Sequence, residues 1–238
     1  YVIMGRNYFK FKQFVIKQEG AAMKVGTDGV LLGAWVNIAD VHSVLDIGTG
    51  SGVIALMIAQ RCKALVHAVE IDITSANQAK SNFETSPWAS RLSIDANSFQ
   101  DFSKNCSSTF DLIVSNPPYF HKSLKPATAD RILARHADQL SNYDLLDGVK
   151  KALSPEGRFC AIFPYIEGNI FIAEAANFGL FCNRKLYIQS KSDNPIIRIL
   201  TEFSFGKKRL VEDTISIHTL EGEYTDEYKR LTADFYLA

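Results

Sequence analysis

The chain has 238 residues and 47% of them are hydrophobic, which suits one domain with a full core and at most a small extension. Lysine plus arginine equals aspartate plus glutamate at 26 each, so net charge indicates no partner. No apolar run reaches the roughly 18 residues of a membrane helix, and no signal pattern opens the chain, which predicts a soluble, cytoplasmic protein. The four cysteines form no CxxC pair, so no metal or redox site is indicated.

The first 40 residues stand apart from the rest. An aromatic and basic segment runs to Gln18, and residues 23–35 indicate a turn leading into an apolar helix. We expect residues 1–40 to form an extension and residues 41–238 to form the main domain, the two together making one structural unit.

Strand and helix patterns alternate from about residue 43 to 178, in the order β, α, β, α, β, β, α, β, α. Strands are predicted at 44–47, 65–71, 92–96, 110–115 and 158–163. Helices are predicted at 53–59, from Thr74 as N-cap to Ser86 and Pro87, and after the capping box formed by Ser141 and Asp144. This order favours a parallel sheet covered on both faces. Beyond Gly179, segments 184–189 and 197–205 predict an antiparallel hairpin.

A glycine loop follows the first of these strands, with Gly48, Gly50 and Gly52 after Asp46. A nicotinamide fingerprint needs a glycine where Val53 stands, which argues against a dinucleotide. A carboxylate ahead of the turn suits a ligand that carries an ammonium and a sulfonium, so S-adenosylmethionine is favoured. A purely structural turn is the alternative.

Glu70 ends the next predicted strand, 22 residues beyond Gly48 (70 − 48). A carboxylate there can accept hydrogen bonds from both hydroxyls of a ribose, because open parallel sheets bind ligands at the carboxyl ends of their strands. Surface ion pairing is the alternative for this side chain.

The candidate catalytic residues are Asn116, Pro117, Pro118 and Tyr119, which follow the strand at 110–115. The Asn116 side chain and the Pro117 carbonyl can accept the two protons of a planar amine, favouring the pyramidal nitrogen of the transition state. The prolines fix the backbone, and the Tyr119 ring can stack on a flat base. A simple Asn-Pro turn is the alternative.

These motifs resemble a known family. Segments 46–52, 69–72 and 116–119 resemble the Rossmann-like, S-adenosylmethionine-dependent amino methyltransferases. Segments 11–14, 23–35, 86–88 and 231–237 closely resemble the bacterial valine-tRNA adenine-37 N6-methyltransferases. The resemblance implies a class I α/β fold with a seven-stranded, mostly parallel sheet, an antiparallel hairpin at one edge and helices on both faces.

The resemblance also implies an activity and further contacts. The reaction places a methyl group on the 6-amino group of the adenine beside the anticodon and leaves S-adenosylhomocysteine. Lys24, Thr27 and Asp28 are implied to help hold the cofactor. Members of the group usually carry an acidic residue after the third strand, where this chain has Asn97 and Ser98; either side chain can accept the hydrogen bond of the cofactor's adenine.

Two basic segments are candidate RNA contacts, and tRNA is the expected partner, with no obligate protein partner evident. They contain Lys10, Lys12 and Lys17, and His121, Lys122, Arg131 and Arg135. Ordinary solvated side chains are the alternative. Two other functions stay open: methylation of another planar amine, in a protein glutamine or a ribosomal RNA base, and non-catalytic, cofactor-dependent RNA binding. The intact tetrapeptide argues against the last.

Overall fold

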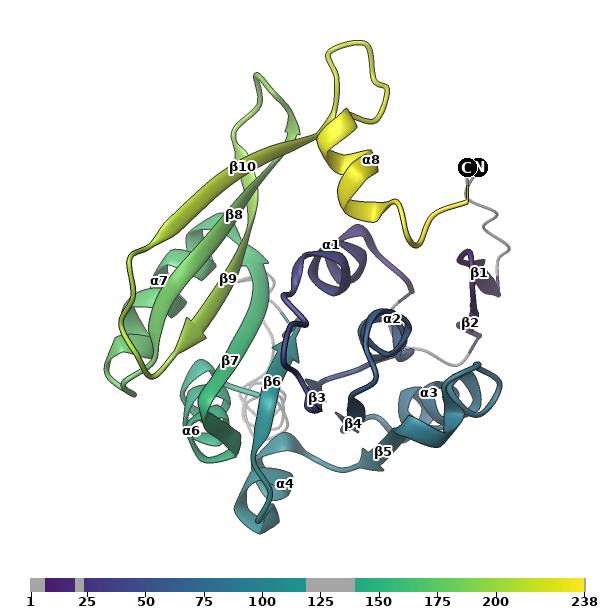
Figure 1. Ribbon diagram of the computed structural model, residues 1–238, viewed down its shortest axis with the longest axis vertical. Coiled ribbons are helices and arrows are strands. Elements are labelled where there is room, and N and C mark those ends of the chain that lie inside the picture. The colour runs from purple at the N-terminus through teal and green to yellow at the C-terminus, as the bar shows by residue number, and fades with distance from the viewer. Residues whose placement is uncertain (1–6, 20–23, 119–139, 238) are drawn as a thin grey trace, which may run out of the picture.

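The structure is a computed structural model and describes residues 7–19, 24–118 and 140–237. Within these ranges one 8-stranded sheet runs in the order β10-β8-β9-β7-β6-β3-β4-β5, and β1 and β2 form a separate 2-stranded sheet. Helices cover both faces of the large sheet (Figure 1).

The strands are β1 (Tyr8–Lys10), β2 (Val15–Lys17), β3 (Ser43–Ile47), β4 (Leu65–Glu70), β5 (Leu92–Ala96), β6 (Phe110–Ser115), β7 (Leu153–Pro164), β8 (Phe181–Lys191), β9 (Ile196–Ser204) and β10 (Val211–His218). The helices are α1 (Thr27–Trp35), α2 (Val53–Arg61), α3 (Ile73–Glu84), the short 3-10 helix η1 (Ala89–Arg91), α4 (Phe99–Asn105), α6 (Asn142–Ala152), α7 (Tyr165–Ala176) and α8 (Asp226–Thr232).

The topology confirms the expected class of fold. Strands β5, β4, β3, β6 and β7 pair in parallel, and β9 lies antiparallel between β7 and β8. The hairpin expected at 184–189 and 197–205 is therefore present as β8 and β9. The expected number of strands was wrong, because β10 adds an eighth strand parallel to β8. Its first four residues are exposed and only Ile217 is buried, so the apolar pattern that marks a strand is weak there.

Three local expectations also need correction. The connection after β5 contains α4, whose cap is Ser98; this helix buries only Phe99 and Ser103, too little for a clear apolar period. Helix α3 is capped by Asp72 instead of Thr74, because the Asp72 carboxylate accepts from the Ser75 N–H at 2.7 Å. The strand predicted at 158–163 begins earlier, because β7 starts at Leu153 and shifts its register with β6 between Leu153 and Arg158.

Two hydrophobic cores lie on opposite faces of the sheet. One is built largely from α1, α2 and α3 and includes the aromatic residues near the start of the chain. The other lies beneath α4, α6 and α7. Of the capping box expected before α6, the N-cap is confirmed, since the Ser141 side chain accepts from the Asp144 N–H.

The N-terminal hairpin of β1 and β2 packs against the C-terminal segment. Phe11 is 1% exposed and its ring stacks on Tyr236 with 6.3 Å between ring centroids. The Lys12 N–H donates to the Phe235 carbonyl at 2.9 Å, and the Lys12 ammonium donates to the Ala233 carbonyl at 2.6 Å. Residues from both ends of the chain therefore share one hydrophobic core.

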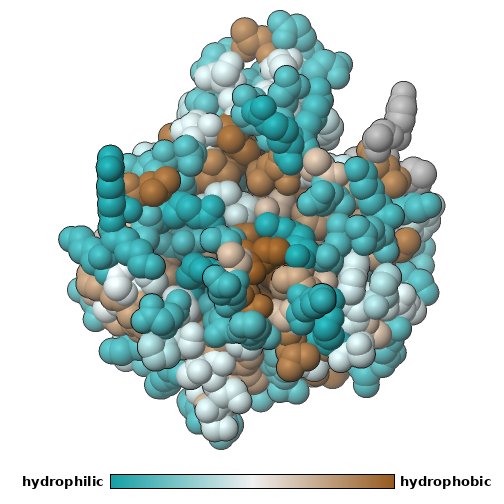
Figure 2. Space-filling model, viewed as in Figure 1, coloured by the Kyte–Doolittle hydropathy of each residue, from teal (hydrophilic) through white to brown (hydrophobic). Residues whose placement is uncertain are grey.

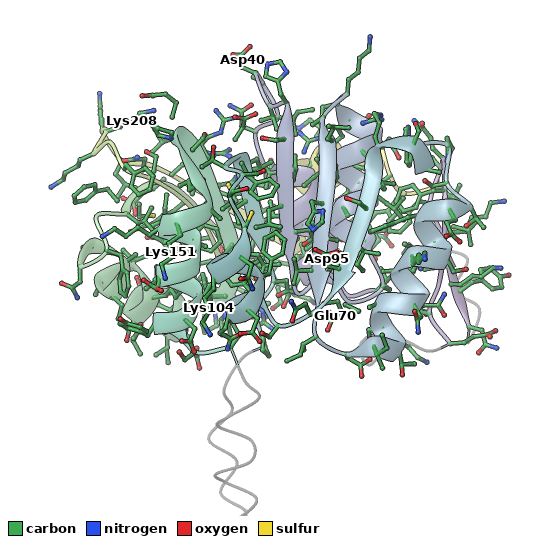
Figure 3. All side chains as sticks on the ribbon, turned by 90° about the horizontal axis from the view of Figure 1, so that it is seen from below. Asp40, Glu70, Asp95, Lys104, Lys151 and Lys208 are labelled. Atoms are coloured by element: carbon green, nitrogen blue, oxygen red, sulfur yellow. The ribbon has the colours of Figure 1, made fainter. Side chains whose placement is uncertain are left out.

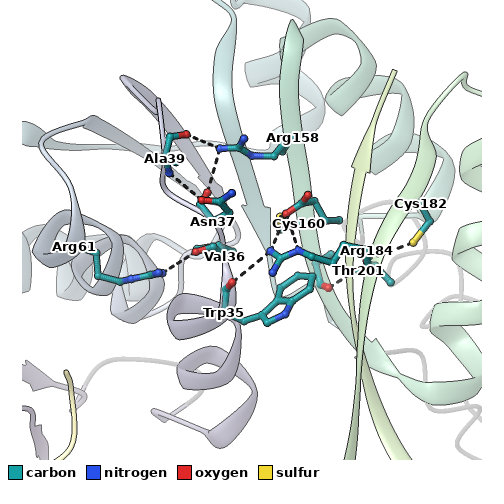
Figure 4. A network of polar contacts seen from close by, with 12 residues as sticks. Trp35, Val36, Asn37, Ala39, Arg61, Arg158, Cys160, Cys182, Arg184 and Thr201 are labelled. Atoms are coloured by element: carbon teal, nitrogen blue, oxygen red, sulfur yellow. Dashed lines mark hydrogen bonds and ion pairs between the residues drawn. The ribbon is translucent and has the colours of Figure 1, made fainter. Parts of the chain in front are cut away.

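Arginines from three elements hold the C-terminal end of α1 (Figure 4). Arg61 donates to the carbonyls of Gly33 and Val36, and Arg158 donates to those of Asn37 and Ala39. The Arg184 guanidinium lies 3.8 Å above the centroid of the Trp35 ring and pairs with Glu202 at 2.8 Å. The bonds to Gly33 and Val36 satisfy carbonyls that a helix end leaves without partners, and those to Asn37 and Ala39 hold the segment that follows α1.

The surface drawn in Figure 2 is mostly hydrophilic, with hydrophobic residues showing near the centre of that face. The exposed large hydrophobic side chains include Leu65 on β4, Tyr143 on α6 and Ile166 on α7. No helix among the described residues is long and apolar enough to cross a membrane.

Candidate active site

The carboxyl ends of β3, β4 and β6 bring the sequence motifs together. Because these strands are parallel and in register, Ile47 lies beside Val69 on one side and Ser115 on the other. The residues that follow are the glycine loop, Glu70 and Asn116. Figure 3 shows Glu70 at the end of the sheet opposite Asp40. The motifs therefore lie together at the edge where open parallel sheets bind ligands.

The glycine loop needs its glycines for two different reasons. Gly48 and Gly50 have φ of +68° and +58°, and a Cβ atom on either would meet nothing within 4 Å. Gly52 has φ of +86°, and its Cβ would lie 2.5 Å from the Phe83 ring of α3. Gly48 and Gly50 therefore border open space, whereas Gly52 allows α2 and α3 to pack closely.

Asp46 lies under the loop and is fully buried. One carboxylate oxygen, Oδ2, accepts from the Thr49 hydroxyl at 2.6 Å and from the Ala55 N–H at 3.1 Å. The other oxygen, Oδ1, has no hydrogen-bond partner among the described residues. Burial raises the pKa of Asp46 to about 7 from its ordinary 3.8, although both hydrogen bonds oppose the shift. The carboxyl group therefore holds the loop through Oδ2, while Oδ1 accepts no hydrogen bond from the described residues.

Glu70 is held by two backbone donors. Its Oε2 accepts from the Gly50 N–H and its Oε1 from the Asp72 N–H, both at 2.9 Å. These bonds join the end of β4 to the loop after β3 and fix the carboxylate at the wall of a cavity.

Two cavities meet at this edge. The first, about 290 Å³, is mainly apolar and is bordered by Glu70, Asn97 and Phe99. The second, about 430 Å³, lies beneath the first turn of α1 and is bordered by Lys24, Thr27, Asp28 and residues of β8, β9 and β10. Gly48, Gly50 and Asn116 border both. Asn116 therefore stands where the two spaces join.

The tetrapeptide extends toward a third space. Pro118 borders the first cavity, and Pro117 and Pro118 border a smaller one of about 90 Å³ next to α6 and α7. Tyr119 lies outside the described residues, as do His121, Lys122, Arg131 and Arg135.

Some residues predicted to contact the cofactor or RNA border neither of the two cavities that Asn116 borders. Ser98 caps α4, since its hydroxyl accepts from the Asp101 N–H at 3.1 Å, whereas Asn97 borders the first cavity. Lys10, Lys12 and Lys17 are exposed on the N-terminal hairpin, and Lys12 contacts Ala233. No group of three or more His, Cys, Asp or Glu side chains in the described ranges is arranged to hold a metal ion.

Sequence reasoning missed Arg198. This residue of β9 borders the second cavity, and its Nε lies 2.8 Å from Oδ2 of Asp28. The two residues are 170 positions apart, so no local pattern connects them. Sequence reasoning also missed three isoleucines that border the same cavity, because on strands they look like ordinary core residues. They are Ile188, Ile197 and Ile217.

The fold is that of known methyltransferases. The family model of the methyltransferase small domain matches residues 25–153, more than half of the chain. A solved structure titled as a predicted O-methyltransferase from Agrobacterium tumefaciens has a TM-score of 0.66 at 17% identity, covering 87% of this chain and 96% of that one. An N-methyltransferase from Bradyrhizobium japonicum has a TM-score of 0.52 at 18% identity, covering 73% and 90%. The fold and the family model together define a Rossmann-like methyltransferase.

Curated relatives narrow this class. A tRNA1(Val) (adenine(37)-N6)-methyltransferase from Trichodesmium erythraeum is 46% identical over 237 residues, covering 98% of this chain and 99% of the relative. A protein of the same name from Photorhabdus laumondii is 39% identical over 237 residues, covering 99% and 97%. The chain belongs to the tRNA1(Val) (adenine(37)-N6)-methyltransferase family, which confirms the resemblance seen in the sequence.

Proposed function

We propose that the protein transfers a methyl group from S-adenosylmethionine to the 6-amino group of adenine 37 in valine tRNA, in the cytoplasm. The observation that carries this proposal is the position of Asn116, which borders both cavities at the carboxyl end of β6. An amide at that junction can contact an acceptor in one space and lie beside a donor in the other. The names of the relatives supply the substrate.

The residues of the first cavity fit the cofactor. Gly48 and Gly50 leave room that a Cβ would fill, and the Glu70 carboxylate suits the two hydroxyls of a ribose. Asn97 and Phe99 offer an acceptor and a ring for the adenine. Asp46 is buried beneath the loop and borders neither cavity, so its part is to hold the glycine loop through Thr49 and Ala55. When bound, S-adenosylmethionine supplies a methyl group activated by its sulfonium.

The chain's own contribution is to orient the accepting amine. The Asn116 carbonyl can accept one amine proton and the Pro117 backbone carbonyl the other, which directs the nitrogen lone pair toward the methyl group. Hydrogen bonds of this geometry strengthen as the nitrogen becomes pyramidal, so they favour the transition state over the ground state. The adjacent prolines hold the acceptors in place before the substrate arrives.

Labelled S-adenosylmethionine and a valine-tRNA transcript test the proposal, with nucleoside analysis of the product. We expect N6-methyladenosine at position 37, no product from a transcript with guanosine there, and little product from Asn116→Ala. Methyl transfer to ribosomal RNA or to a protein glutamine instead would establish another planar amine as substrate. Cofactor and tRNA binding without transfer would favour the non-catalytic alternative.

A further inference from the structure

The first cavity has a neutral polar end that lies beyond Glu70. Parallel pairing sets the order of strands as β6, β3, β4 and β5, so residues that follow β5 lie on the side of Glu70 away from the glycine loop. The Asn97 N–H donates to the Glu70 carbonyl at 3.0 Å. Among the described residues that border this cavity, Glu70 is the only charged one, and the polar side chains that follow β5 are the carboxamides of Asn97 and Gln100.

The proposed reaction decides which part of the methyl donor meets this end. The sulfonium must lie near Asn116 and the glycine loop, on the β3 side of Glu70, because the methyl group has to reach the accepting amine. With the ribose hydroxyls on Glu70, the base then extends toward β5. Ile71, which is 55% exposed and borders the cavity, offers apolar surface to its ring.

Two of the three polar side chains after β5 are already engaged in local hydrogen bonds. The Ser98 hydroxyl accepts from the Asp101 N–H at 3.1 Å and donates to the Asp101 carboxylate at 3.0 Å, and Ser98 borders a neighbouring hollow instead of the first cavity. The Asn97 Oδ1 accepts from the Ser98 N–H at 2.8 Å. These bonds hold Ser98 and Asn97 in the turn that leads into α4.

Gln100, in the first turn of α4, differs from both. It borders the first cavity and the neighbouring hollow, and no hydrogen bond joins its carboxamide to another described residue. Its acceptor and its donor are therefore both available to a ligand at this end of the cavity.

A carboxamide and a carboxylate distinguish purines differently. Adenine presents its 6-amino donor beside the N1 acceptor, whereas hypoxanthine presents an O6 acceptor beside an N1–H donor. A carboxylate only accepts, so it favours adenine. A carboxamide carries one acceptor and one pair of donors, and a half-turn of its terminal torsion matches it to either base.

We propose that Gln100 binds the base of the methyl donor through its carboxamide, and that the cavity consequently accepts a 6-oxopurine almost as well as adenine. This inference rests on the proposed function and adds the base specificity of the donor site. Asn97 lies beside the same edge and keeps the second lone pair of its Oδ1 for the ligand.

Calorimetry with S-adenosylhomocysteine and with its 6-oxo analogue, S-inosylhomocysteine, tests the proposal. The wild-type protein should bind the two ligands with affinities within about tenfold of each other. Gln100→Glu replaces the amide nitrogen by oxygen at nearly constant shape, so no donor remains for O6. The preference for S-adenosylhomocysteine should then rise by about ten- to hundredfold, whereas Gln100→Leu should weaken both ligands by similar factors.

Two matched variants serve as controls. Gln13→Glu, on the exposed part of the N-terminal hairpin, introduces the same charge away from the cavity and should leave the preference unchanged. Asn97→Asp should change it by less than about threefold, because the engaged oxygen stays on the Ser98 N–H. Urea unfolding of ligand-free Gln100→Glu should stay close to that of the wild type, which a residue with a mainly structural role would not show.

Three results would overturn the proposal. A wild-type preference for S-adenosylhomocysteine well above tenfold would show that a group that only accepts hydrogen bonds contacts the base. An unchanged preference in Gln100→Glu would place Gln100 away from the base, and a rise confined to Asn97→Asp would give the role to Asn97. A wild-type protein that binds neither ligand would instead overturn the proposed function, and the donor site with it.

Discussion

Replacing Gly50 or Gly52 by alanine should separate the two roles of the glycine loop. Both residues have a positive φ, at +58° and +86°, so each substitution costs about 1–2 kcal/mol of backbone strain. At Gly52 the new methyl group would also lie 2.5 Å from the Phe83 ring, which is 3% exposed. Forcing a methyl group into a packed core costs about 1–3 kcal/mol more.

The expected totals are therefore about 1–2 kcal/mol of lost stability for Gly50→Ala and about 2–5 kcal/mol for Gly52→Ala. Ligand binding should show the opposite order. The methyl group of Gly50→Ala enters space shared by both cavities, so affinity for S-adenosylhomocysteine should fall about tenfold or more. Gly52→Ala adds its methyl group toward α3 and should bind almost normally while folded.

Urea unfolding and calorimetry measure the two quantities, and Phe83→Leu in the Gly52→Ala background tests the clash directly. The smaller side chain should recover part of the lost stability. Equal destabilisation by the two alanines would show that Phe83 does not restrict position 52. Unchanged ligand affinity in Gly50→Ala would show that the open space above Gly50 is not the cofactor site.

Asn116→Ala removes one transition-state contact worth on the order of 2.7–4 kcal/mol, so single-turnover methyl transfer should fall roughly a hundredfold or more while tRNA binding persists; a near-normal rate would contradict the proposed role. Glu70→Ala should weaken S-adenosylhomocysteine binding by about 1–3 kcal/mol, and calorimetry showing no change would remove Glu70 from the site. Asp46 has a raised pKa of about 7 in the folded protein against 3.8 ordinarily, so its folded form retains a proton that the unfolded chain releases. The contribution of this group to stability should therefore decrease as pH rises from about 4 to about 7. Urea unfolding measures it as the difference in unfolding free energy between wild type and Asp46→Asn. A difference that does not change with pH over this range would show that the carboxyl titrates normally.

The alternating pattern from β3 to β7 predicts the parallel sheet, and the parallel sheet explains why the motifs meet. Gly48, Glu70 and Asn116 each follow a strand, so one edge of the sheet collects them without any knowledge of side-chain contacts. The enclosure of Asp46 was harder to foresee. Its hydrogen bonds to Thr49 and Ala55 depend on how the loop curls back over the strand end.

Contacts between distant parts of the chain account for what the pattern missed. The pair of Arg198 and Asp28 depends on the antiparallel β9 lying near the start of α1, and no periodicity encodes that distance. Strand β10 and helix α4 bury few residues, so both depend on neighbouring elements more than on their own apolar pattern.

The packing of the N-terminal hairpin against the C-terminal segment has a consequence during synthesis. Lys12 bonds to Ala233, 221 positions later, and the Phe11 ring stacks on Tyr236. At about 5–20 residues per second, the ribosome needs roughly 10–45 s to cover that separation. Until then Phe11 can pack only on Phe9 and Phe14 of its own hairpin, and the face that later meets Tyr236 stays uncovered while nearly all of the sheet is made.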